Sequence, residues 1–167
     1  MNPIDTSKHT KYSLELIFGE ADKMSEALLK SLSENVNKSF ILFALYASLI
    51  SFSFVKVTSK EWIYLSLLVG VILSAIVLYK NLFPFVIVFR GAEPNKIINS
   101  YFDNFKGEEL DKELLATQIE NYEDAMTQNR ETVGKMVNRF NNSIKVLVLS
   151  VLLFVALWYL HGTAECF

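Results

Sequence analysis

The stretch from Leu110 to Leu160 constrains the fold of this chain more than any other feature. Its first two thirds are charged but carry apolar residues three or four positions apart, which places them on one face of a helix. These residues are Leu115, Ile119, Tyr122, Met126, Val133, Val137, Phe140 and Ile144. Its last third, 144–160, reads IKVLVLSVLLFVALWYL, and Gly134 is the only strong helix-weakening residue in the stretch. We expect one helix, or two nearly continuous helices, that begins in water and ends in a bilayer.

Two further segments are free of charged residues. They are 39–55, SFILFALYASLISFSFV, and 62–79, WIYLSLLVGVILSAIVLY. The first is at the short end of what a helix needs to cross about 30 Å of hydrocarbon. The link between them, 56–60, is short and polar. The sequence therefore predicts an all-α membrane protein with a two-span hairpin over 39–79 and a third span over 144–160.

The spacing of apolar residues before the first span predicts an amphipathic helix over 11–38. We expect residues 1–10 to be a mobile start. The apolar positions of the helix repeat at three and four, and they are Leu14, Ile17, Ala21, Met24, Leu28 and Leu32. The polar face is more acidic than basic, which is unlike a helix that seeks a lipid surface. We expect the apolar face to pack against the charged part of the C-terminal helix; a second copy or the membrane surface are the alternatives.

We expect the region 80–143 to be helical and to lie in water. Within it, 82–89 is too short to cross a bilayer and contains Pro84, so we expect an extended or interfacial segment there. A short helix is expected over 95–105, before the long C-terminal helix begins.

The distribution of basic residues predicts the topology. Five Lys lie in 1–38, two in 56–60, nine Lys or Arg in 80–145, and none after the third span. Basic residues remain on the cytoplasmic side of a membrane. We therefore expect 1–38 and 80–143 to face the cytoplasm, and the tail 161–167 to face outward.

Small residues recur on the first two spans. Ser66, Gly70 and Ser74 are spaced by four, and Ala44, Ser48 and Ser51 form a similar face. Small residues at this spacing let helices approach closely, so these six are candidates for helix packing or for lining a pore. Packing within one subunit is the simpler interpretation. The spans have no ionisable residue in their interiors, which disfavours a proton relay or coupled transporter but leaves a pore of hydroxyls and apolar constrictions open.

Polar residues outside the spans suggest two other roles. Asn129 lies where the apolar stripe of the C-terminal helix skips, so it either fixes the register and copy number of a helical assembly or simply faces water. Arg90, Arg139 and Lys145 are expected at the cytoplasmic membrane face, as topology determinants and contacts to lipid headgroups. The alternative is that they form, with Lys96, part of a basic pocket for a phosphorylated or nucleotide ligand.

Composition and motifs disfavour other classes of protein. A net charge of −2 argues against a nucleic-acid-binding surface. The sequence has no Gly-rich phosphate loop, metal-ligand cluster or nucleophile motif, and its two histidines fall on opposite sides of the membrane in the expected topology. We expect no catalysis and no cofactor.

The order of these segments resembles a known group of proteins. The resemblance rests on the hairpin at 39–79, the juncture Phe89-Arg90-Gly91-Ala92-Glu93-Pro94, and the segment from Asn129 to Lys145 that leads into the last span. This layout is similar to the small multi-span effector subunits of bacterial anti-phage systems, including the SLATT-type group. The chain departs from the SLATT pattern in its third span, so no functional residue is carried over.

The resemblance implies an oligomeric effector of the bacterial inner membrane that permeabilises or depolarises the membrane when triggered. The expected partners are membrane lipid, further copies of the chain, and a soluble cytoplasmic protein or a nucleotide as trigger. The alternative is a membrane-anchored sensor or scaffold that recruits a soluble cytoplasmic partner.

Overall fold

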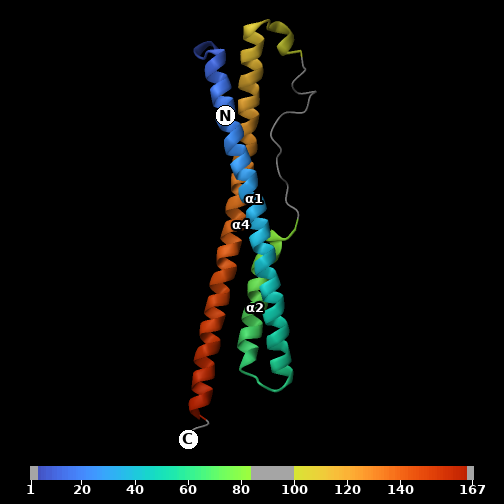
Figure 1. The fold of residues 1–167 in the computed structure, drawn as a ribbon, viewed down its shortest axis with the longest axis vertical. Coiled ribbons are helices and arrows are strands. Elements are labelled where there is room, and N and C mark those ends of the chain that lie inside the picture. Colours follow the sequence, from blue (N-terminus) through green and yellow to red (C-terminus); the bar gives the residue numbers. More distant parts are fainter. Residues whose placement is uncertain (1–3, 84–99, 165–167) are drawn as a thin grey trace. The chain divides into compact units, whose positions relative to one another are not determined.

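The computed structural model describes residues 4–83 and 100–164, and every regular element within those two ranges is a helix (Figure 1). The long helices are α1, Lys11–Thr58, α2, Tyr64–Leu78, and α4, Glu108–Ala164. Short 3₁₀ turns lie at Thr6–Lys8, Tyr79–Asn81 and Phe102–Asn104. Residues 84–89 of the predicted segment 82–89, and 95–99 of the predicted helix 95–105, lie outside the described residues. The described remainder of that helix, 100–105, contains only the 3₁₀ turn Phe102–Asn104.

Three of these helices are long and apolar enough to cross a membrane. They are α1, α2 with its 3₁₀ extension to Asn81, and α4. The all-α prediction and the number of candidate spans are thus confirmed for the described residues. The predicted amphipathic helix and first span belong to one unbroken helix, α1, and the charged stretch and last span are likewise continuous in α4.

The chain divides into two compact units, and α1 and α4 contribute to both. The first unit contains 4–32 and 100–133, and the second contains 33–83 and 134–164.

In the first unit, α1 and α4 pair in parallel. Lys11 Nζ lies 2.6 Å from Asp111 Oδ2, and the Tyr122 hydroxyl donates to Asp22 Oδ1 at 3.1 Å, so residue numbers rise together along both helices. Residues 4–10, for which the sequence predicted a mobile start, also bond to α4: the Ile4 amide donates to Glu120 Oε1 at 2.7 Å. This is the pairing that the amphipathic pattern of 11–38 favoured.

The predicted stripes are buried only in part. Leu14, Ala21 and Leu32 of the stripe on 11–38 are buried, and so are Ile119 and Tyr122 of the stripe on the C-terminal helix. Ile17 and Met24 are 41% and 53% exposed. One set of buried positions recurs every seven residues on each helix: Ser25, Leu32, Ser39, Tyr46 and Ser53 on α1, and Tyr122, Asn129, Met136 and Ser143 on α4. A spacing of seven is the repeat of coiled-coil packing, and small residues at these positions let two backbones approach closely.

In the second unit, α1, α2 and α4 pack around Tyr46, Leu67, Val71 and Leu78. The turn between α1 and α2 begins later than predicted, because α1 continues to Thr58. The Glu61 amide bonds to the Lys56 carbonyl at 3.1 Å and the Lys60 amide to the Val57 carbonyl at 3.0 Å. These bonds form a Schellman motif with Lys60 in the left-handed conformation.

Candidate functional site

Six buried polar residues form a seam inside the second unit. They are Ser39, Tyr46 and Ser53 on α1, Ser74 on α2, Asn81 on its 3₁₀ extension, and Ser143 on α4. None is more than 1% exposed. Polar groups are costly in an apolar interior unless they are hydrogen-bonded, so the partners of each group decide what this polar seam can do.

The middle of the polar seam joins all three helices. The Ser143 hydroxyl donates to the Ser74 carbonyl at 2.9 Å, and the Tyr46 hydroxyl lies 2.7 Å from Ser143 Oγ. Because a serine hydroxyl has one hydrogen, which Ser143 gives to Ser74, Tyr46 is the donor to Ser143. Ser74 in turn donates to the Gly70 carbonyl of its own helix at 2.8 Å.

Asn81 joins the same three helices at Ser39 and Met136, which lie seven residues before Tyr46 on α1 and seven before Ser143 on α4. Its Nδ2 donates to the Met136 carbonyl at 2.9 Å and to Ser39 Oγ at 3.3 Å. Within the described part of the chain, the Oδ1 atom of Asn81 and the Oγ atom of Ser53 are buried without a hydrogen-bond partner. An unpaired buried group of this kind costs about 1–3 kcal/mol, so these two atoms are the weak points of the polar seam.

Beside the polar seam, α2 and α4 approach closely at Gly70. The nearest residue is Ser150, which lies seven positions after Ser143 and donates to the Val146 carbonyl at 2.7 Å. Gly70 has no side chain to hold the two helices apart.

The two sets of small residues named as candidates from the sequence differ in burial. Gly70 and Ser74 are buried and Ser66 is half-buried, so the small face of α2 lies in or beside the packing of the protomer. Ala44, Ser48 and Ser51 are exposed, and the two hydroxyls bond to their own helix, at the Ala44 and Ala47 carbonyls, both at 3.0 Å. Packing within one subunit, the simpler interpretation, does not hold for this face of α1.

The other candidate residues do not join the polar seam. Asn129 is buried in the first unit, with 3% exposure, and does not face water. Arg139 is half-buried and Lys145 exposed in the second unit. Arg90 lies outside the described residues.

Sequence reasoning missed most of the polar seam. Ser39, Tyr46, Ser53, Asn81 and Ser143 were not candidates, because a serine or tyrosine within an apolar run carries little signal by itself. The spacing of seven from Ser39 to Tyr46 to Ser53, and again from Ser143 to Ser150, was the available signal.

Uncharged hydroxyl and amide groups between helices can hold the helices in register or, when hydrated, line a path for water and ions. The three apolar helices and this polar seam are typical of a multi-pass α-helical membrane protein. No protein-family model, no curated protein and no solved structure matches the chain.

Proposed function

We propose that this chain is an oligomeric effector of the bacterial inner membrane, of the kind used in anti-phage defence, that permeabilises or depolarises the membrane when triggered. In this proposal 1–38 and 80–143 face the cytoplasm, except that Asn81 and Ser143 lie in the membrane as parts of the polar seam. The tail faces outward, and Arg139 and Lys145 lie toward the cytoplasmic face. The polar seam is then the closed form of the path along which water and ions cross the membrane.

The extent of the polar seam supports this role. Ser39 and Ser53 are separated by fourteen residues of α1, or about 21 Å of helix, against about 30 Å of hydrocarbon. The apolar side chains of Leu67, Val71 and Leu78 pack beside it, as in a hydrophobic gate that closes by excluding water. The unpaired oxygens of Ser53 and Asn81 favour an open form in which water reaches them.

The test is a potential-sensitive dye assay on liposomes that contain the purified full chain under a potassium diffusion potential. Val71→Asn adds a polar group to the apolar gate formed by Leu67, Val71 and Leu78, and is expected to raise the leak at least tenfold over the unmodified chain. Ser53→Val removes a hydroxyl of the polar seam and is expected to lower the leak of the Val71→Asn protein at least fivefold.

Ser51→Val is the matched control for Ser53→Val. It removes a hydroxyl from the same helix, but that hydroxyl is exposed and satisfied by the Ala47 carbonyl, so the leak is expected to stay unchanged. Absence of a leak in both the unmodified and the Val71→Asn protein contradicts the proposal, and so does an equal loss from both serine variants.

A second role, a membrane-anchored sensor or scaffold, is favoured by the charge of the first unit. Its helical segments, 11–32 and 108–133, contain twelve Asp or Glu against five Lys or Arg. Such a surface is suited to a basic soluble partner. A scaffold loses its partner when 108–133 is replaced by a neutral helix and shows no leak in the liposome assay.

A further inference from the structure

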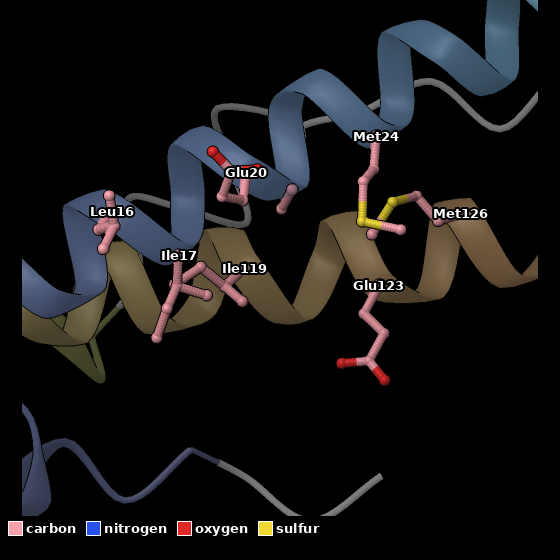
Figure 2. A pocket seen from close by; sticks show the side chains of 8 residues that line it. Leu16, Ile17, Glu20, Met24, Ile119, Glu123 and Met126 are labelled. Carbon is pink, nitrogen blue, oxygen red and sulfur yellow. The ribbon is translucent and has the colours of Figure 1, made fainter.

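The paired helices of the first unit leave an apolar groove along one side (Figure 2). The groove has a volume of about 350 Å³ and is lined by Leu16, Ile17, Ala21, Met24, Ile119 and Met126. Figure 2 shows Met24 of α1 and Met126 of α4 with their side chains toward each other, and Glu20 and Glu123 also line the groove.

A second hollow, of about 300 Å³, continues the groove along the same helices. Met24 and Met126 line both hollows, and the second extends to Ser31 of α1 and Arg130 of α4. From Leu16 to Ser31 the groove follows fifteen residues of helix, or about 22 Å, which is the length of about four helical turns.

Large apolar side chains remain exposed along this groove. Leu16 is 60% exposed and Met24 is 53% exposed, although both belong to the most highly charged part of the chain. A continuous apolar surface rimmed by polar residues marks an interaction site. Methionines adapt their shape to a partner, and an apolar groove of this length is suited to the apolar face of a helix.

The charge of the first unit decides between the occupants. A second copy would bring two equally acidic helix pairs together, which like-charge repulsion disfavours. We propose that the groove binds an amphipathic helix of a soluble partner protein whose polar edges carry Lys or Arg. This inference goes beyond the proposed leak and does not depend on it, because binding is measured without conduction.

The experiment uses the full chain in nanodiscs of zwitterionic lipid and two labelled eighteen-residue helical peptides. Both peptides have one leucine face; one carries Lys on its polar edges and the other carries Glu. Fluorescence anisotropy is expected to show the Lys peptide binding at least tenfold more tightly than the Glu peptide, with empty nanodiscs as the baseline.

Two neighbouring charge reversals locate the site. Glu123→Lys places a positive charge on the groove and is expected to weaken binding of the Lys peptide at least fivefold. Asp124→Lys changes the net charge equally on the next residue, which is exposed but does not line the groove, and is expected to weaken binding less than twofold. Circular dichroism of both variants checks that each helix pair is folded.

Cross-linking identifies any competing occupant. A photo-reactive residue at position 24 is expected to label the Lys peptide. Labelling of position 24 of another copy, or of residues 84–99 of the same chain, in place of the peptide overturns the proposal. Equal affinity for the two peptides, or equal effects of the two reversals, also overturns it.

Discussion

A Cβ atom added to Gly70 would lie 1.9 Å from the Oγ of Ser150 and 2.2 Å from its Cβ. Atoms that are not bonded to each other do not approach so closely. The clash includes Ser150 Cβ, which a change of rotamer does not move. The separation of α2 and α4 at this level is therefore set by the absence of a side chain at residue 70.

Gly70→Ala is expected to lower the free energy of unfolding by about 1–3 kcal/mol, because the two helices must separate to admit the methyl group. Unfolding in mixed detergent micelles, followed by circular dichroism, measures this loss. Adding Ser150→Gly removes both clashing atoms and is expected to recover most of it. A double variant as unstable as Gly70→Ala would show that the clash lies elsewhere.

The hydrogen bond from Tyr46 to Ser143 is suited to a double-mutant cycle. Tyr46→Phe and Ser143→Ala each remove one partner, and we expect a coupling energy of about 0.6 kcal/mol, the average for such bonds between membrane helices. Ser143→Ala is expected to cost more than Tyr46→Phe, because Ser143 also donates to the Ser74 carbonyl. Zero coupling would contradict the observed contact.

Lys60 has a φ of 69°, a conformation that is costly for any residue with a Cβ. Lys60→Gly is expected to stabilise the turn by up to about 1 kcal/mol, less the entropy that glycine adds to the unfolded chain. Lys60→Ala keeps the Cβ and serves as the control, with no gain expected. The midpoint of thermal unfolding in detergent is the readout, and equal midpoints for both variants would refute the assignment.

Gly19 and Gly134 both lie inside long helices, and an added Cβ meets nothing within 4 Å at either position. Each change to alanine is expected to stabilise its helix by about 0.5–1 kcal/mol through helix propensity alone. The chemical-denaturation midpoint of each variant checks this. Destabilisation by Gly134→Ala, with stabilisation by Gly19→Ala, would indicate that α4 must bend at Gly134.

The helices could be predicted far better than the site. The second span, predicted over 62–79, is α2 at Tyr64–Leu78, and the stretch 110–160 lies within α4 at Glu108–Ala164. Hydropathy and the absence of proline act within one segment, so they are visible without a partner. The buried positions were harder to predict. Met24 fitted the apolar stripe but is half-exposed, whereas Ser39, at the start of an uncharged run, and Ser143, between Arg139 and Lys145, are fully buried.

The sequence by itself determined that three apolar helices are present, because the free energy of transferring a segment into hydrocarbon is a sum over its own residues. Only the tertiary structure decided which polar groups meet. Whether Asn81 reaches Ser39, or Gly70 admits Ser150, depends on the register and spacing of helices far apart in the chain, and the residues of one segment alone do not specify these.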